Sequence, residues 1–436
     1  MWRNLRLVTS VWVNCIAKGK NMKHVSRTIL ASLVALMSTS ALVSAWAQED
    51  DLAKALTGGD VSLDVRYRYE AVDQDGFSQD ASASTLRTKL AYKTGTFYGF
   101  SGLVEIENVA EIGSDDDYNS TTNGNGAYPI VADPSGTEIN QAALFYTGFD
   151  GTTLIGGRQK IVLDNQRFVG AVGFRQNDQT FDAVTLKNTS LDDLTVQYSY
   201  IWNVNRIQGD DHANGDWASE THLLNAKYSG LGFGAVSAYA YLIDPTEVLN
   251  YGAASQTYGV RFAGKAVVAE GVKAVYEAEI AQQSDYGDNP TSYSALYYHG
   301  AAGLSASGFT VKLGYEVLGS DEGGAAFQTP LATGHKFSGW ADKFLSTPAN
   351  GLEDLYAAAI YQHSFGEGVV DQVKVMVVYH DFSANDGGAD YGSEWDAVLN
   401  VGVYKNFYVE AKYAAYEADT YATDTQKLWL AVGAKF

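Results

Sequence analysis

The first long alternating stretch of the chain reads Val61-Ser62-Leu63-Asp64-Val65-Arg66-Tyr67-Arg68-Tyr69-Glu70, with apolar or aromatic side chains at the odd positions and polar ones at the even positions. Successive side chains of a β-strand point to opposite faces, so this stretch predicts a strand with one apolar and one charged face. The same alternation returns in segments of about ten residues, separated by turn-rich stretches. The clearest are 86–93, 194–203, 272–281, 309–317, 407–416 and 426–436. We therefore expect an all-β protein.

The composition narrows the class of protein. The chain has 436 residues, a single cysteine, 44 glycines, 29 tyrosines and a formal net charge of −21. One cysteine excludes a disulfide-stapled scaffold and a cysteine-rich metal site. With 19% charged and 13% aromatic residues, the sequence is not typical of intrinsic disorder. The acidic balance argues against a nucleic-acid partner, because phosphate binding needs a basic surface.

The connections between the alternating segments favour a membrane barrel over a soluble β-sandwich, which would also alternate. Short turns and long polar loops follow each other along the chain, as in outer-membrane barrels with short periplasmic turns and long extracellular loops. Tyr and Trp cluster toward segment ends, where they would form interfacial girdles. The chain also stops at Phe436 within an alternating segment. We predict a transmembrane antiparallel β-barrel of 18 strands, or 16 if the marginal segments Thr152–Arg158 and Thr180–Asn188 are not strands.

Residues 1–47 predict a leader that precedes the barrel domain, 48–436. The leader has six basic residues and no acid, an apolar run from about Ile29 to Val43, and Ala45-Trp46-Ala47 at its end. A basic start, a short apolar stretch and an A-x-A site are typical of a secretory signal peptide. The alternative is an N-terminal anchor helix, although the run is shorter than the roughly 20 residues that span a bilayer. Met22, which opens the basic region of this signal, is the expected initiator, and Met1 is the alternative.

If the apolar face of each strand meets lipid, the polar face lines the lumen. Charge on the lipid face costs roughly 2–4 kcal/mol for Arg or Lys at the midplane, so inward placement is strongly favoured. The register points inward the cations Arg66, Arg68, Arg87, Lys89, Lys93, Lys273, Lys312, Lys374, Lys412 and Lys427, together with the acids Glu105, Glu107, Glu277, Glu279, Glu316 and Glu410. Rings of Arg and Lys select anions. The alternative is that these charges solvate the pore and pair with one another.

Two loop regions carry a family resemblance. One runs from Gly156-Gly157-Arg158-Gln159 through Leu163–Gly170 and Phe174–Asn177 to Gln179–Asp182. The other is Ala332–Phe344, continued by Thr347-Pro348 and Asn350-Gly351-Leu352. Both resemble the alginate export family of bacterial outer-membrane barrels, particularly its porin-like members. The resemblance implies an 18-stranded barrel with an electropositive, Arg-rich constriction for an anionic polysaccharide.

By this resemblance Arg158, Arg167 and Arg175 become constriction candidates, with Asp164 and Asn165 as ordering partners. The 159–178 loop is also far less acidic than its neighbours and carries Lys160, Arg167 and Arg175, which suits a loop folded into a channel. The alternative is that its arginines pair with Asp164, Asp178 and Asp182. The 334–344 loop is expected to fold inward or to cap the mouth as a packed lid, with His335, Lys336, Trp340 and Lys343.

The sequence therefore predicts an outer-membrane, porin-like channel, not an enzyme and without a cofactor, that passes small anionic or sugar-acid solutes through an Arg/Lys-lined lumen. The alternatives are a dedicated exporter of an alginate-like polysaccharide and a plugged structural or adhesion barrel. Expected partners are outer-membrane lipid, lipopolysaccharide, an anionic or saccharide solute, and the barrel-assembly machinery acting on Phe436. The acidic loops, such as Asp210-Asp211, are expected to form a solvated outer surface, with bridging of divalent cations to lipopolysaccharide as the alternative. No H-E-x-x-H or G-x-S-x-G motif occurs, although a Ser–His pair formed only in space would escape such a search.

Overall fold

The computed structural model describes residues 49–113, 117–366 and 368–436, and the predicted leader lies outside them. By their contacts, residues Met1–Leu56 form one unit and Thr57–Phe436 a second. Helix α3 (Glu49–Thr57) carries an ion pair between Lys54 and Asp51, with 3.9 Å between Nζ and Oδ1. Within the described ranges, no helix combines the length and apolarity needed to cross a membrane.

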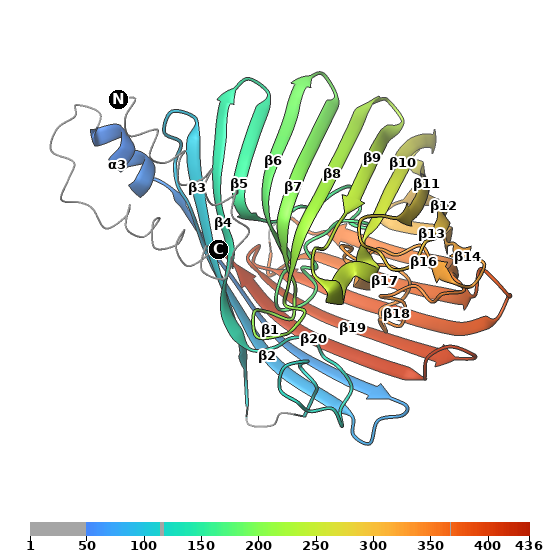
Figure 1. The fold of residues 1–436 in the computed structure, drawn as a ribbon. Helices are drawn as coiled ribbons and strands as arrows, with labels where there is room; N and C mark the ends of the chain where they lie inside the picture. The colour runs from blue at the N-terminus through green and yellow to red at the C-terminus, as the bar shows by residue number, and fades with distance from the viewer. Residues whose placement is uncertain (1–48, 114–116, 367) are drawn as a thin grey trace. The chain divides into compact units, whose positions relative to one another are not determined.

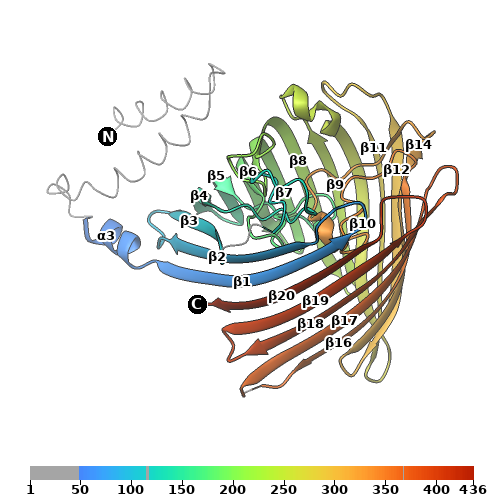
Figure 2. The ribbon, with the colours of Figure 1, turned by 90° about the horizontal axis from the view of Figure 1, so that it is seen from below.

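The second unit is a closed antiparallel barrel of 18 strands (Figures 1 and 2). Each strand pairs with its neighbours along the chain, and β1 pairs with both β2 and β20, which closes the sheet. The strands are β1 (Asp60–Gln74), β2 (Ala81–Lys93), β3 (Phe100–Glu111), β4 (Gly136–Phe149), β5 (Thr152–Gln159), β6 (Thr180–Leu191), β7 (Leu194–Asn205), β8 (Asp216–Leu231), β9 (Gly234–Ile243), β10 (Ser255–Ala269), β11 (Val272–Asp285), β12 (Ser294–Ala306), β13 (Phe309–Leu318), β16 (Leu352–Ser364), β17 (Val370–Ser383), β18 (Asp390–Val403), β19 (Phe407–Ala418) and β20 (Thr425–Lys435). The 18-strand prediction is confirmed, and the 16-strand alternative is wrong because the marginal segments form β5 and β6.

The polar face of each strand points inward, as the alternation predicts. In β1, Arg68 and Glu70 are 2% and 1% exposed. In β20, Trp429 is buried, while Leu428, Leu430 and Val432 are exposed on the outer face. Closure pairs every backbone N–H and C=O that an open sheet would leave unpaired at its edges. The alternating pattern therefore fixes which side chains meet the lumen.

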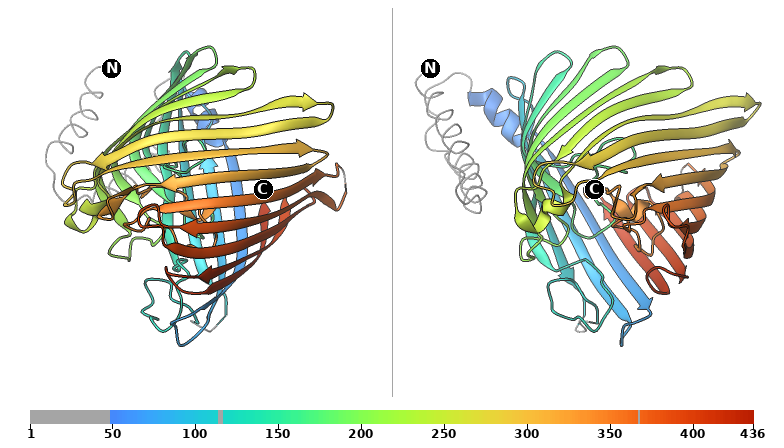
Figure 3. Two further views of the ribbon diagram at one scale, coloured as in Figure 1. Left: turned by 90° about the vertical axis from the view of Figure 1, so that its right-hand side faces the viewer. Right: turned by 45° about the vertical axis from the view of Figure 1, so that its right-hand side comes forward.

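Short and long connections lie at opposite ends of the strands (Figure 3). The two-residue turn Glu270-Gly271 between β10 and β11 was not predicted from the sequence; Gly271 adopts a φ of +71° there, which glycine tolerates without strain. The long connections include 112–135, 160–179, 206–215 and 319–351. The last carries the short strands β14 (Ser320–Asp321) and β15 (Ala325–Ala326), which pair only with each other, and the 3-10 turn η2 (Gly334–Lys336). A second 3-10 turn, η1 (Val248–Ala253), lies between β9 and β10.

The hydrophobic core lies inside the barrel rather than outside it. Phe168 of the 160–179 connection packs against the inward rings of Tyr239 and Tyr297, with centroids 5.4 and 5.2 Å apart, and against Phe327 at 5.7 Å. These side chains belong to one buried cluster that also includes Val169 and Leu331. The long connections thus contribute apolar side chains to the interior, which a freely solvated loop would not do.

Candidate functional site

The 160–179 connection, here called the first inner loop, crosses the lumen. Asp164 accepts hydrogen bonds from Asn225 of β8 (2.8 Å) and Ser237 of β9 (2.6 Å). At the other end of the loop, Gln176 Nε2 donates to Thr85 of β2 at 2.8 Å. In its middle, Arg167 pairs with Glu316 of β13. In the closed strand order these are three separated sectors of the wall, so the loop is held across the interior.

The 319–351 connection, the second inner loop, is joined to the first. Val169 and Leu331 form an isolated parallel β-bridge, and the Gly170 N–H donates to the Leu331 carbonyl at 2.9 Å. The Thr333 N–H donates to the Gln166 carbonyl at 3.1 Å, and Lys336 Nζ donates to the Asn165 carbonyl at 2.8 Å. The two regions singled out by sequence resemblance therefore form one structural unit.

The second inner loop is anchored on β18 by two inward carboxyl groups. The N–H of Trp340 donates to Asp396 Oδ2 at 3.2 Å, and the N–H of Ala341 donates to Glu394 Oε1 at 2.6 Å. Gly339 has a φ of +82°, and a Cβ there would lie 2.3 Å from Glu394 Oε2. Only glycine allows this approach of backbone to carboxyl. This part of the loop consequently packs against the inner wall.

Lys412 of β19 is enclosed by aromatic rings from three segments. Its ammonium lies 3.7 Å from the ring centroid of Trp340, 4.5 Å from that of Phe174 and 5.2 Å from that of Trp429. It also contacts Nε2 of His335. A cation over ring faces is worth about 2 kcal/mol when desolvated. Lys412 thus joins both inner loops to β19 and β20.

His335 is a neutral bridge in this cluster. Its Nδ1 lies 2.7 Å from Asp342 Oδ1, an acceptor, so Nδ1 carries the proton and Nε2 accepts from Lys412. Burial and the charge of Lys412 hold the pKa of His335 well below its ordinary value. Burial would raise the pKa of the Asp342 carboxyl, but the hydrogen bond from His335 and the charges of Lys427 and Arg175 hold it well below the usual range.

The three predicted constriction arginines are all ion-paired. Arg158 forms a two-point contact with Asp182 (2.8 and 3.2 Å), the one expected pair that is found. Arg167 binds Glu316 through Nε and Nη2 at 2.7 and 3.2 Å. Arg175 contacts Glu70 at 3.0 Å and Asp342 at 3.1 Å. Burial alone would lower the pKa of Arg175, but these carboxylates and Asp133 raise it above its ordinary value.

The other residues that the sequence predicts for the pore also lie beside the inner loops. Lys160 and Lys89 share Asp178, and Lys160 also contacts Glu105 while Lys89 contacts Glu107. Arg87 pairs with Asp64 at 2.8 Å, and Arg68 pairs with Asp133 of the 112–135 connection. Arg66 donates to the carbonyls of Gly173 and Arg175. The side-chain oxygen of Asn165 accepts from the N–H of Arg167. Asp164 makes no hydrogen bond or ion pair with an arginine among the described residues. It was expected to be an arginine partner, but it binds Asn225 and Ser237 of the wall instead.

Some cations at the inner loops keep an uncompensated charge. Across residues 49–113, 117–366 and 368–436, neither Lys336 nor Lys343 forms an ion pair, and Arg66 bonds only to carbonyl and amide oxygens. Burial and the neighbouring charge of Lys427 lower the pKa of Lys343 to about 8. The cations without a carboxylate partner at the crossing are therefore fewer than the sequence indicates.

A cavity of about 640 Å³ opens above the inner loops, toward the long-loop end. Arg175, His335 and Asp342 reach it from the loops, and Arg206 and Trp217 from the base of the 206–215 connection. Sequence reasoning missed Arg206, because a lone arginine in an acidic loop carries no motif. No cluster of three or more His, Cys, Asp or Glu side chains in the described part of the chain could hold a metal ion.

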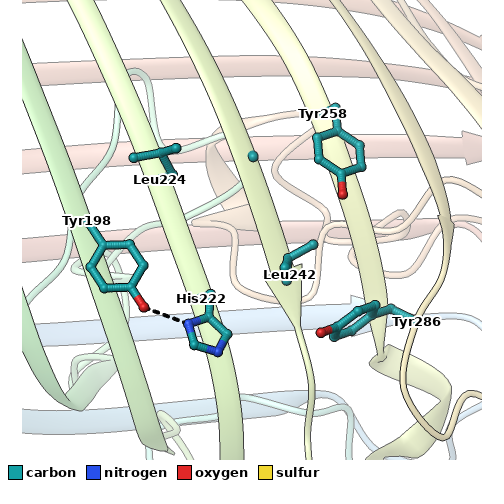
Figure 4. A pocket seen from close by; sticks show the side chains of 7 residues that line it. Tyr198, His222, Leu224, Leu242, Tyr258 and Tyr286 are labelled. Carbon is teal, nitrogen blue, oxygen red and sulfur yellow. Dashed lines mark hydrogen bonds between the residues drawn. The ribbon is translucent and has the colours of Figure 1, made fainter.

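A second hollow, of about 410 Å³, lies on the outer face of β7–β10 (Figure 4). Leu224 and Tyr258 are exposed there, whereas their sequence neighbours Leu223 and Thr257 are buried on the inner face. Tyr198 Oη and His222 Nδ1 lie 2.7 Å apart at its edge. Because it faces outward, this hollow is not part of the lumen.

The fold matches solved outer-membrane barrels. The Acinetobacter baumannii protein OccAB4 superposes with a TM-score of 0.68 at 15% identity, covering 86% of this chain and 97% of that one. Pseudomonas aeruginosa OccK9 (OpdG) gives 0.67 at 18% identity, covering 88% and 100%. P. aeruginosa OpdK, solved with vanillate, gives 0.65 at 14% identity, covering 86% and 98%. No protein-family model matches the sequence, and neither does any curated protein.

These likenesses show that the chain has the 18-stranded antiparallel barrel fold of the solved Occ and Opd outer-membrane porins. At 14–18% identity they establish the fold and nothing finer. The likenesses do not show that the chain belongs to the alginate export family.

Proposed function

We propose that this protein is an outer-membrane channel for small anionic solutes, including sugar acids, and that the two inner loops form its constriction. The observation that carries the proposal is the loop pair held across the lumen by Asp164, Arg167 and Gln176. An 18-stranded barrel leaves an aqueous interior unless something fills it. The inner loops narrow that interior and decide what passes.

Charge gives the constriction its preference. Lys336, Lys343 and Arg66 present positive charge without a carboxylate partner, while the neighbouring arginines are compensated by fixed acids. A positive potential focused between low-dielectric walls raises the local concentration of anions, and salt weakens it. OpdK, which shares the fold, was crystallised with vanillate, an aromatic carboxylate. The bound vanillate of that protein supports a carboxylate-bearing solute here.

The test is the reversal potential of purified, refolded protein in a planar bilayer under a potassium chloride gradient. The proposal predicts stepwise conductance with a reversal potential shifted toward the equilibrium potential of chloride. It also predicts that selectivity weakens as total salt rises, because screening shortens the range of the loop charges. A cation-selective channel would overturn the proposal.

The plugged barrel is a second candidate, favoured by the buried aromatic cluster of Phe168, Tyr297 and Phe327 inside the lumen. Absence of any conductance, with the barrel shown to be folded, would support it. Export of an alginate-like polymer rests on the sequence resemblance alone and stays a prediction.

The proposed partners follow from the membrane setting. The outer apolar face would contact lipid, and the acidic loops would bridge divalent cations to lipopolysaccharide. Phe436, 60% exposed at the end of β20, is the proposed contact of the barrel-assembly machinery.

A further inference from the structure

Glu394 and Asp396 lie on the inward face of β18, and the second inner loop rests on both. The two residues are 0% and 1% exposed. One oxygen of each carboxyl group accepts a loop N–H, Asp396 Oδ2 from Trp340 at 3.2 Å and Glu394 Oε1 from Ala341 at 2.6 Å. The loop backbone is therefore held at this point by two acidic side chains that are closed off from solvent.

The second oxygen of each carboxyl group has no donor. Glu394 Oε2 and Asp396 Oδ1 are buried and accept no hydrogen bond from any residue that the structure describes. The two side chains nevertheless lie within hydrogen-bonding reach of each other. Ionised carboxyl groups only accept hydrogen bonds, so two carboxylates in this position would repel each other and leave both oxygens unsatisfied. A single proton between them supplies the missing donor.

The cation nearest to the pair is a histidine that a third carboxyl group shares. Nε2 of His380 on β17 lies 3.7 Å from Asp396 Oδ2, but its Nδ1 lies 2.9 Å from Asp354 Oδ1 on β16. Within the described ranges, no lysine or arginine forms an ion pair with Glu394 or Asp396. Three buried carboxyl groups therefore share one imidazole.

The other titratable groups around the pair belong to β19 and to the loop itself. Lys412 of β19 lies among its aromatic rings, and Tyr416 of the same strand donates its hydroxyl to backbone carbonyls. On the loop, Asp342 binds Arg175, and Lys343 forms no ion pair in the described part of the chain. None of these groups donates to either free carboxyl oxygen, so the need for a donor between the two acids remains.

We propose that Glu394 and Asp396 are positioning residues of the constriction, and that they hold the second inner loop as a pair that shares one proton. With the loop docked, the proton lies between Glu394 Oε2 and Asp396 Oδ1, and the other two oxygens accept the loop N–H groups. When the loop leaves, water reaches both carboxyl groups and takes up the proton. The inference rests on the proposed function, to which it adds the residues that keep the constriction in place.

Docking of the loop therefore takes up a proton. A solvated carboxyl group loses its proton at about pH 4, whereas a carboxyl group buried beside a second one can keep it to about pH 8–9. Between these limits, each unit of pH should lower the ratio of docked to released loop about tenfold. Openings of the loop should consequently become more frequent as the pH rises.

The experiment is single-channel recording across a pH series. The unaltered protein should show brief openings of higher conductance whose frequency rises with pH. Asp396→Asn should abolish this rise, because the amide donates to Glu394 Oε2 without a proton to lose and its oxygen still accepts from Trp340. Asp396→Leu, which offers neither group, should release the loop at every pH. Asp419→Asn removes an exposed carboxyl group after β19, and this matched control should keep the rise.

Glu394→Gln keeps the test informative if Asp396→Asn does not fold. It places the amide on the other partner of the pair, and the frequency of openings should again be independent of pH. A rise with pH that persists in both amide variants would overturn the inference.

Infrared difference spectroscopy of the detergent-solubilised barrel tests the shared proton without a channel measurement. A protonated carboxyl group has a C=O stretching band that a carboxylate lacks. The spectrum of the unaltered protein minus that of Asp396→Asn should contain this band at neutral pH, and the band should shift in deuterium oxide. Absence of the band would overturn the inference.

The two proposals fail separately. A cation-selective channel would defeat the proposed function, while the infrared band would still establish the shared proton. An anion-selective channel without the band keeps the function and removes the role of this pair. Lys343, whose pKa is lowered to about 8, changes ion selectivity rather than the frequency of openings, so its effect is measured separately.

Discussion

The imidazole of His335 lies flat against the ring of Phe174, with centroids 3.4 Å apart and planes inclined by 13°. The two residues belong to different inner loops and stack beside the caged ammonium of Lys412. Because His335 is neutral, the stack gains from ring contact without the cost of burying a second cation. It is the point where both loops and the β19–β20 wall meet.

Replacing Phe174 by Ala should loosen this junction. The variant loses the stack on His335 and one face of the Lys412 cage, about 1–3 kcal/mol of local contacts. We expect larger single-channel conductance with more frequent current fluctuations, because the loops leave their places more often. Single-channel recording measures both.

Phe365→Ala is the control for that variant, since Phe365 is exposed in a short turn at the other end of the barrel. It removes the same side chain and should leave conductance and current noise unchanged. Identical recordings for both variants would contradict the role given to the Phe174–His335 stack.

The Arg167–Glu316 pair should hold the first inner loop on β13. Arg167→Met leaves Glu316 buried with only Tyr297 and Ser338 as donors, which we expect to cost about 3 kcal/mol. Hydrogen exchange of the Leu163 and Gly170 amides should accelerate accordingly. The double variant Arg167→Met/Glu316→Gln should recover much of that protection, because no unpaired charge remains. A double variant no better than the single one would argue against the ion pair as the anchor.

Lys343 should make anion selectivity depend on pH. With a pKa lowered to about 8, its side chain is charged below that pH and neutral above it. Selectivity for chloride should therefore fall as pH rises from about 7 to about 9, where ordinary lysines stay charged. Lys343→Met should begin with lower selectivity and show a flat profile over this range. Reversal potentials recorded across the pH series measure this fall in selectivity. If the Lys343→Met variant shows the same fall between pH 7 and 9, another group is responsible for it.

Lysine substitutions on the two faces of β13 test which face of the strand meets lipid. Leu313 is 63% exposed there, in the middle of the strand. Leu313→Lys should lower the unfolding free energy in lipid vesicles by roughly 2–4 kcal/mol. Thr310→Lys, on the inward face of the same strand, should cost far less. Urea titration measures both, and equal costs would contradict the assignment of faces.

Much of the wall could be predicted from the sequence, because strand alternation is a local property. The segment 61–70 lies in β1, and all but the last residue of the segment 426–436 lies in β20. The inward placement of Arg68 and Lys412 follows from the two-residue period alone. The two-residue turn at Glu270-Gly271 was missed because Gly271 is the one turn-favouring residue between two apolar stretches.

The site was less accessible to this reasoning, since its contacts are long-range. Arg167 and Glu316 are separated by 149 positions, and no pattern in one sequence couples them. The nearby acids in the sequence, Asp164 and Asp178, were the natural partners to expect, yet Asp164 binds the β8–β9 wall and Asp178 binds two lysines. Arg206 and Trp217 form a pair only because the 206–215 connection closes on itself.

We propose that the inner loops, and not the barrel wall, set the width and the charge preference of the pore. This claim is tested by the single-channel conductance of a variant in which residues 332–344 are replaced by a short Gly-Ser linker, in protein shown to be a folded barrel. We expect conductance several-fold above that of the unaltered protein, with chloride preference reduced. Unchanged conductance and unchanged selectivity would contradict the claim.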